Sequence, residues 1–139
     1  MSIKIKFDLN IMKFISMFES LTKASVKDCI VEEGRIIFIV RKGEIAKAIG
    51  KKGANIRKVE NLIKKKVKII EFSEDLVEFV KNVVAPLKVL DVVDVEGIVT
   101  VTPVDSKIRG MLIGRSAVNL RGFEAIVQRY FPIKEMKVI

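Results

Sequence analysis

Apolar positions along the chain follow a helical period in some segments and cluster as in strands in others. The first helical stripe, with Asp8 or Asn10 expected as its N-cap, has apolar residues three and four apart, at Ile11, Phe14, Ile15, Phe18 and Leu21. β-Branched residues are frequent in 26–31 and 35–40, on either side of Glu33-Gly34, which predicts a hairpin. Two helices and a strand complete this half, over 44–49, 54–65 and 67–72.

The second half of the chain repeats this succession. Ser73 is the expected cap of a helix that Pro86 ends, and its buried stripe contains Leu76, Phe79, Val80, Val83 and Val84. The later elements are two strands, two helices and a last strand, over 89–95, 98–104, 106–113, 118–131 and 136–139. Each half reads α-β-β-α-α-β, an α+β arrangement, and no linker rich in Gly, Ser or Pro separates them. We therefore expect two domains, at 1–72 and 73–139.

An internal repeat supports this division. Residues 49–63 align with residues 113–127, and five of the fifteen positions are identical. The turn signals Glu33-Gly34 and Glu96-Gly97 are 63 residues apart, close to the 64-residue offset between the aligned segments. Recurring signals at a fixed spacing indicate one structural module used twice.

The charge of the chain is concentrated in one segment. The net charge is +9, and residues 41–68 account for all of it, with eleven Lys or Arg against Glu44 and Glu60. A basic run is most often a solvated helix face. A local excess that surrounds a glycine turn is instead typical of a site for a polyanion.

That glycine turn is Gly50-Lys51-Lys52-Gly53, between the helices predicted at 44–49 and 54–65. Glycines let the backbone approach a ligand closely, because no Cβ intervenes. The start of the following helix presents backbone N–H groups and the positive end of the helix dipole to an anion. Lys51 and Lys52 add positive charge that suits phosphates.

A glycine pair in this helix–turn–helix setting resembles the backbone clamp of KH domains, which grips about four nucleotides. The order α-β-β-α-α-β resembles the type II KH fold, a three-stranded sheet covered by helices. Two such domains in tandem resemble the archaeal NusA-like transcription factors. The resemblance implies binding of single-stranded, nascent RNA and an effect on transcription elongation, termination or antitermination. It implies RNA polymerase or the elongation complex as a further partner.

The resemblance also implies roles for individual residues of the first domain. The N–H groups of Gly50, Lys51, Lys52 and Gly53 would contact phosphates, which the two lysines would neutralise. Aliphatic side chains would form the floor of the groove, with Ile45, Ile49 and Ile56 as candidates, although each is also a plausible core residue. Further phosphate or base-edge contacts would come from Lys42, Lys47 and Arg57.

In the second domain the corresponding turn is Gly114-Arg115-Ser116-Ala117, so alanine replaces the second glycine. Gly114, Arg115 and Ser116 remain candidates for an RNA contact. Ala117 adds a Cβ where the backbone would touch a phosphate. Two interpretations stand: a weakened clamp that extends one RNA path, which we favour slightly, or a degenerate unit retained for packing.

The composition argues against several other classes of protein. Without histidine, imidazole catalysis and imidazole metal sites are excluded, and the single Cys29 excludes an internal disulfide. The spacing from Gly43 to Gly50 does not fit a nucleotide-hydrolysing P-loop. No apolar run spans a membrane and the N-terminus lacks a secretory signal, so a cytoplasmic protein is expected. We expect no enzyme activity, cofactor or small-molecule substrate.

Two other nucleic-acid functions remain open from the sequence. A ribosome- or rRNA-associated KH protein has the same chemistry and differs only in its RNA. A DNA-binding helix-turn-helix protein would need exposed base-reading side chains on the helix over 54–65, where Asn55, Arg57 and Asn61 are the candidates. The lysine-containing glycine turn favours phosphate contact over this reading.

Overall fold

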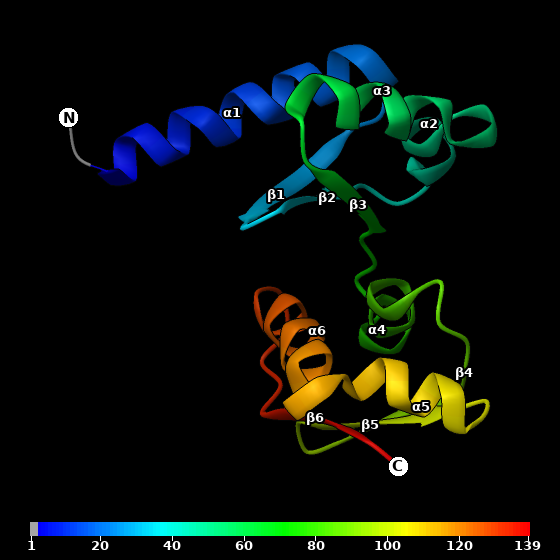
Figure 1. Cartoon of the computed structure of the whole chain (residues 1–139). Coiled ribbons are helices and arrows are strands. Elements are labelled where there is room, and N and C mark those ends of the chain that lie inside the picture. The colour runs from blue at the N-terminus through cyan, green and yellow to red at the C-terminus, as the bar shows by residue number, and fades with distance from the viewer. Residues whose placement is uncertain (1–2) are drawn as a thin grey trace. The chain divides into compact units, whose positions relative to one another are not determined.

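A computed structural model describes residues 3–139 of the chain, with side chains from residue 10 onward. It divides into two compact units, Met1–Phe72 and Ser73–Ile139. The first unit contains, in order, α1 (Ile3–Thr22), β1 (Val26–Glu32), β2 (Arg35–Val40), α2 (Ile45–Ile49), the 3₁₀ turn η1 (Lys51–Gly53), α3 (Ala54–Ile63) and β3 (Lys66–Glu71). In this unit the helices lie over one face of the sheet (Figure 1).

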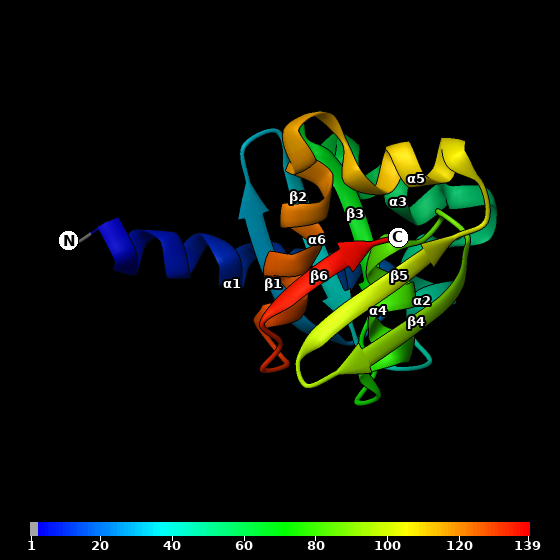
Figure 2. The ribbon, with the colours of Figure 1, turned by 90° about the horizontal axis from the view of Figure 1, so that it is seen from below.

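The second unit has the same order of elements. They are α4 (Leu76–Val84), β4 (Val89–Val95), β5 (Ile98–Pro103), α5 (Ser106–Ile113), the 3₁₀ turn η2 (Arg115–Ala117), α6 (Val118–Gln128) and β6 (Glu135–Val138). Figure 2 shows its three strands side by side, with β5 between β4 and β6. Both units are therefore mixed α+β structures with helices on a three-stranded sheet, which is consistent with a KH-type fold.

The two sheets share one topology. In the first, β1 pairs antiparallel with β2, and β2 pairs parallel with β3. In the second, β4 pairs antiparallel with β5, and β5 pairs parallel with β6. Each antiparallel pair has a register shift at the start of its first strand, between Val26 and Asp28 and between Val89 and Asp91. The parallel third strand requires a crossover, and the helix pair that carries the glycine turn supplies it.

The core of the first unit lies between the helices and the sheet. Phe18 of α1 stacks on Phe38 of β2, with 4.1 Å between the ring centroids. The other buried members of this cluster are Ala24, Val26, Cys29, Ile36, Val40, Ala48 and Val59. Cys29 is buried on β1, as the sequence predicted. Because α2 and α3 each contribute a fully buried residue, Ala48 and Val59, the turn between them is anchored to the core.

The second unit has its own core. The apolar stripe predicted for α4 is largely confirmed, because Phe79, Val80, Val83 and Val84 are buried. The rings of Tyr130 and Phe131 lie 5.5 Å and 5.6 Å from the ring of Phe79. The sheet contributes Val92, Val99, Val101 and Met136.

Several helix ends differ from the sequence predictions. Helix α1 begins at Ile3, so Asp8 and Asn10 lie inside it and neither is its N-cap. The N-cap of α4 is Asp75, whose carboxylate accepts from the Glu78 N–H, and Ser73 Oγ accepts from the Asp75 N–H just before the helix. These ends depend on local hydrogen bonds, which a hydrophobic period does not encode.

Two helices are shorter than predicted. Helix α3 ends at Ile63 because Lys64 adopts a left-handed conformation, and α6 ends at Gln128, before the aromatic pair that packs on Phe79.

No helix within residues 3–139 is long and apolar enough to cross a membrane. Over the same residues, no group of three or more His, Cys, Asp or Glu is placed to hold a metal ion.

Candidate nucleic-acid interface

The turn between α2 and α3 is built from unusual backbone conformations. Gly50 has φ 77° and ψ 170°, a region that essentially only glycine occupies. Lys52 (φ 54°, ψ 32°) and Gly53 (φ 76°, ψ 16°) are both left-handed. The Gly53 N–H donates to the Gly50 carbonyl at 3.1 Å, so the four residues close a tight loop at the start of α3.

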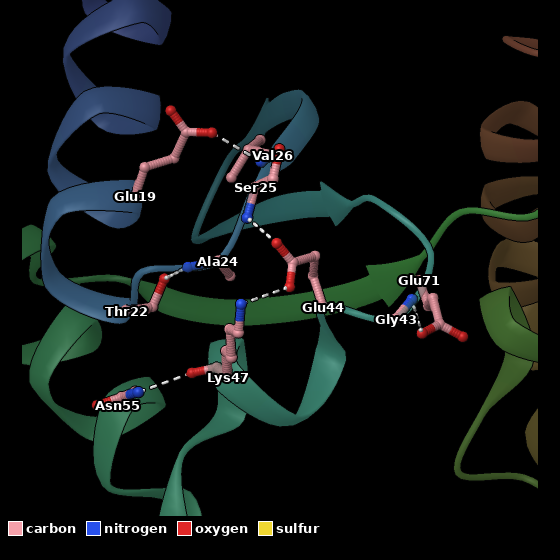
Figure 3. Close-up of polar contacts among 10 residues, drawn as sticks. All are labelled: Glu19, Thr22, Ala24, Ser25, Val26, Gly43, Glu44, Lys47, Asn55 and Glu71. Atoms are coloured by element: carbon pink, nitrogen blue, oxygen red, sulfur yellow. Dashed lines mark hydrogen bonds and ion pairs between the residues drawn. The ribbon is translucent and has the colours of Figure 1, made fainter.

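Asn55 fixes this turn from the inside. Its Nδ2 donates to the Lys47 carbonyl of α2 at 2.7 Å, as Figure 3 shows. A Cβ added at Gly50 would lie 2.7 Å from the Asn55 side chain and 2.8 Å from its backbone nitrogen. The absence of a side chain at Gly50 and the amide of Asn55 are therefore parts of one arrangement, which holds α2 and α3 together.

Arg57 supports the other side of the loop. Its Nη1 donates to the Lys52 carbonyl at 2.6 Å. Lys52 has an unfavourable left-handed conformation, and this bond holds its carbonyl in place. Arg57 thus lies at the turn, and one of its N–H groups holds the loop.

The turn of the second unit has almost the same backbone. Gly114 has φ 73° and ψ 176°, Ser116 has φ 54° and ψ 32°, and Ala117 has φ 61° and ψ 22°. Asn119 Nδ2 donates to the Met111 carbonyl at 2.9 Å, which repeats the bond of Asn55. Alanine therefore occupies the left-handed position of Gly53 without changing the loop.

The charged side chains expected at the first turn are exposed, and that of Lys47 forms an ion pair. Lys42, Lys51 and Lys52 are exposed on the loops that flank α2 and α3. Lys47 Nζ lies 3.2 Å from Glu44 Oε2, and its side chain is 59% exposed. A ligand phosphate that uses Lys47 must share it with Glu44.

Glu44 ties the start of α2 to the rest of the unit. Its other oxygen, Oε1, accepts from the Ser25 N–H at 3.2 Å, between α1 and β1 (Figure 3). The Gly43 N–H donates to Glu71 Oε2 at 3.0 Å, at the end of β3. The segment that leads into α2 is thereby fixed to the residue before β1 and to the end of β3.

The isoleucines proposed as a groove floor are all half-buried. Ile45 packs against the core cluster of the first unit, so it also has a structural role. Ile49 and Ile56 lie directly before and after the turn, and each retains some exposed surface. All three flank the turn in sequence, on α2 and α3.

In each unit, a glutamate of the helix that follows the turn binds the backbone of the third, parallel strand. Glu60 Oε2 accepts from the Val67 N–H at 2.9 Å, and Glu124 Oε2 accepts from the Met136 N–H at 2.8 Å. Sequence reasoning missed these roles of the two glutamates and the matching roles of the two asparagines. The internal repeat contained a signal for these roles, because Asn119 matches Asn55 and Glu124 matches Glu60 in the aligned segments.

One lysine of the basic segment has a lowered pKa. Burial first and the Arg35 guanidinium second lower the pKa of Lys68, Glu32 opposes the shift, and the result is a pKa of about 8. Lys68 lies on β3, where it pairs with Ile37 in register. Its charge is lost as the pH rises through about 8, so this residue contributes less than a full positive charge in mildly alkaline solution.

We expect Gly50→Ala to destabilise the first unit strongly. The new Cβ would collide with Asn55, and an alanine in this backbone region is strained by about 1–3 kcal/mol before the collision is counted. Chemical denaturation monitored by circular dichroism measures the effect. Gly122→Ala in α6 is the matched control, because nothing lies within 4 Å of its added Cβ and its φ is not positive. Equal stability of the two variants would contradict this account.

We expect Asn55→Ala to loosen the turn without unfolding the unit. The variant loses the bond to the Lys47 carbonyl, worth about 1 kcal/mol. Amide hydrogen exchange should become faster at Gly50 and Gly53, whose N–H groups donate within this region. Asn61→Ala, at an exposed position of the same helix, should leave those amides protected. Unchanged exchange in Asn55→Ala would show that the amide does not hold the turn.

Comparisons with known proteins agree with this geometry. A model of the KH domain family matches residues 14–139. The chain is 36% identical over 131 residues to the probable transcription termination protein NusA of Methanocaldococcus jannaschii, covering 90% of this chain and 70% of that protein. It is 33% identical over 129 residues to the protein of the same name from Halococcus morrhuae, covering 91% and 93%.

A solved structure has the same fold. The crystal structure of APE1850 superposes with a TM-score of 0.75 at 28% sequence identity, and the match covers 94% of this chain and 99% of that one. The KH resemblance predicted from the glycine turn is therefore confirmed at the level of the family. The chain belongs to the KH domain family.

Proposed function

We propose that this chain is a single-stranded RNA-binding protein made of two tandem type II KH domains, at 1–72 and 73–139. The observation that carries the proposal is the Gly50–Gly53 turn at the start of α3, within a segment that holds the whole net charge of +9. KH turns of this kind clamp about four nucleotides through the backbone. The family match and the repeated order of elements support the two-domain reading.

The geometry of the first turn supports the proposed RNA contacts. Lys51 and Lys52 are exposed on a loop that Asn55 and Arg57 hold in place, so phosphates would meet a preorganised backbone. Ile45, Ile49 and Ile56 would form the apolar floor, with Lys42 and Lys47 at its edge. Arg57 would act partly through the loop, because one N–H group already binds the Lys52 carbonyl.

We further propose that the protein acts on nascent RNA during transcription elongation, termination or antitermination. Archaeal relatives named as probable transcription termination proteins support this role. RNA polymerase or the elongation complex would then be a partner, and the site of action would be the cytoplasm. A ribosome-associated role uses the same surface and would be revealed by the RNA that the protein selects.

A helix-turn-helix DNA reader is disfavoured by two hydrogen bonds. Asn55 and Arg57, which would have to read bases from α3, donate instead to backbone carbonyls of Lys47 and Lys52. These side chains hold the turn, so they are poorly placed to discriminate base edges. The geometry therefore favours a phosphate clamp over a recognition helix.

We expect Lys51→Asp/Lys52→Asp to abolish most RNA binding while the protein remains folded. Both side chains are exposed, and each charge-assisted hydrogen bond that the variant removes is worth about 1.5 kcal/mol or more, so affinity should fall at least about tenfold. Fluorescence anisotropy with a single-stranded RNA of about twelve nucleotides, three times the length that one KH turn holds, measures this. Titration at several salt concentrations should also show a smaller salt dependence.

The matched control is Lys13→Asp/Lys81→Asp, which makes the same charge change at two exposed positions outside the basic segment 41–68. It should retain most of the affinity. Duplex DNA serves as the competing ligand. Equal affinity of the turn variant and the control, or a preference for duplex DNA, would refute the proposed clamp.

We expect Ala117→Gly to strengthen the second domain as an RNA site. The left-handed conformation of Ala117 (φ 61°) costs about 1 kcal/mol or more, and its Cβ stands where a phosphate would approach. The variant should be at least as stable as the wild type and should bind RNA more tightly. The reciprocal variant Gly53→Ala should bind more weakly, since its Cβ would lie 3.3 Å from Arg57 Nη1.

An Arg115→Asp/Ser116→Asp variant completes the test of the second domain. It should lower the affinity for the same RNA if this turn also contacts phosphates. If this variant and Ala117→Gly both bind like the wild type, the second domain serves packing alone. The first domain would then be the whole RNA site.

A further inference from the structure

Strand β4 of the second unit combines exposed apolar side chains with a position at the edge of its sheet. The strand order β4-β5-β6 leaves β4 paired with β5 alone within that sheet, and Figure 2 shows it along one side. Leu90, Val93 and Val95 are 68%, 45% and 61% exposed. A sheet edge presents backbone N–H and C=O groups with which another chain can pair. We call residues 90–95 the β4 edge, and the proposed clamp at the glycine turn does not include them.

The hairpin after β4 determines which backbone groups face outward. Both residues of its turn, at 96–97, have positive φ, 51° and 86°, as a two-residue hairpin turn requires. Val95 pairs with the first residue of β5 across this turn, and such a closing pair is hydrogen-bonded. Hydrogen-bonded pairs alternate with non-hydrogen-bonded pairs along an antiparallel ladder, so Val93 also faces β5. The N–H and C=O groups of Val92 and Asp94 therefore point away from β5.

Side-chain hydrogen bonds agree with this assignment. The Val92 N–H donates to Asp91 Oδ1 at 2.9 Å, so a neighbouring carboxylate covers this outward group. The Asp94 carboxylate is directed to the hairpin turn, where its Oδ1 accepts from the Gly97 N–H at 3.1 Å. An incoming strand would therefore meet the outward backbone groups at Asp94 and could replace the local bond at Val92.

The first unit protects its corresponding strand with charged residues. Strands β1 and β4 have the same length, the same register shift and the same two-residue turn, so Lys27 of β1 matches Leu90 of β4. By the same register, Glu32 matches Val95. Lys27 Nζ lies 4.4 Å from the centroid of an aromatic ring of its own unit, and Glu32 forms an ion pair there. Charges at an edge discourage pairing with another chain, and the second unit has apolar residues at both places.

The β4 edge is also acidic. Residues 89–106 are the longest stretch of the chain without Lys or Arg, and Asp91, Asp94 and Glu96 lie within it. All three side chains are exposed. The basic residues of the same sheet lie outside this stretch, with Lys88 directly before β4 and Lys137 on β6. In a chain of net charge +9, this strand attracts a segment of positive charge.

Two other occupants fit the β4 edge poorly. An RNA strand would bring phosphates next to Asp91 and Asp94, and like charges repel. A second copy of the chain that paired its β4 with this one would bring the carboxylates of both copies close together, which is destabilising across strands. A basic, extended protein segment has neither disadvantage.

We propose that the β4 edge is a docking surface for a partner protein, which adds to it an extended segment in which Lys or Arg alternates with apolar residues. Successive side chains of a strand point to opposite faces, so the apolar face of the segment would cover Val93 and Val95 and its basic face would meet Asp94. Main-chain hydrogen bonds to β4 would supply affinity, and the side chains would supply specificity. The inference goes beyond the proposed RNA binding and does not depend on it.

The probe is a fluorescently labelled peptide with blocked ends and the sequence Lys-Val-Lys-Val-Lys-Val, about the length of a typical strand. Fluorescence anisotropy at low salt should detect its binding, because exposed charges are screened least there. A peptide with Glu in place of each Lys should not bind. A peptide with Pro in place of the central Val should bind several-fold more weakly, because proline lacks the backbone donor that strand addition needs.

Amide hydrogen exchange distinguishes strand addition from attraction by charge alone. The peptide should slow the exchange of the Asp94 N–H, which points away from β5. It should change the exchange of the Val93 N–H much less, since that group faces β5.

Val93→Lys should lower the affinity for the peptide several-fold, because it adds a like charge and a charged guard at the edge. Met111→Lys on α5 is the matched control, since Met111 is 46% exposed against 45% for Val93. This control should retain the affinity. Circular dichroism verifies that both variants are folded.

Asp91→Asn/Asp94→Asn is a second variant, which removes two charges and keeps the Oδ1 acceptors for the backbone N–H groups. It should bind the peptide several-fold more weakly and with a smaller dependence on salt. Glu33→Gln/Glu74→Gln is its matched control, at two exposed positions outside β4, and should bind like the wild type.

The outcomes separate this inference from the proposed function. If the β4 variants bind the peptide like their controls, or the proline peptide binds like its parent, no strand adds to β4 and the inference is wrong. It is also overturned if Val93→Lys lowers the affinity for RNA instead, or if the wild type sediments as a dimer that Val93→Lys dissociates. Lys51→Asp/Lys52→Asp should bind the peptide like the wild type, so failure of the RNA clamp would leave this docking surface standing.

Discussion

The structure around the glycine turn depends on one backbone conformation that only glycine adopts readily. Gly50 sits at φ 77° and ψ 170°, and the Asn55 side chain occupies the space beside it while binding the last turn of α2. This arrangement joins α2 to α3 through hydrogen bonds of the chain itself. The loop residues Lys51 and Lys52 can therefore remain exposed in a fixed geometry, and a ligand does not have to order the loop when it binds. The same arrangement at Gly114 and Asn119 gives the second unit an equivalent turn.

The order of elements could be predicted because periodicity reports which face of each element is buried. The stripe of α4 and the two hairpins follow from residues that meet the core, and their positions agree with the structure to within one or two residues. Helix ends were predicted less well, because they depend on single hydrogen bonds and on left-handed residues. Lys64 ends α3 although lysine carries no signal for such a conformation, and Asp75 rather than Ser73 caps α4.

The candidate site, like the fold, was predicted from the sequence only in part. Glycines and lysines at Gly50–Gly53 form a local pattern that the sequence displays directly. The structural roles of Asn55 and Glu44 were missed because their partners are backbone groups 8 and 19 residues away, which no short motif records. Ala117 was expected to weaken the second turn, and its effect on a ligand stays a prediction. Its effect on the backbone is small, since φ 61° and ψ 22° are close to the values of Gly53.

The internal repeat separates what the fold needs from what a ligand needs. The glycine, asparagine and glutamate at positions 50, 55 and 60 recur at 114, 119 and 124, and in both units they make the same turn and the same hydrogen bonds. The positions that differ include Lys52 of the charged turn, where the second unit has Ser116. Because the second unit forms the same turn with serine at this place, the fold does not require the lysine. The charge of Lys52 is therefore better explained by a polyanion at the glycine turn than by the architecture.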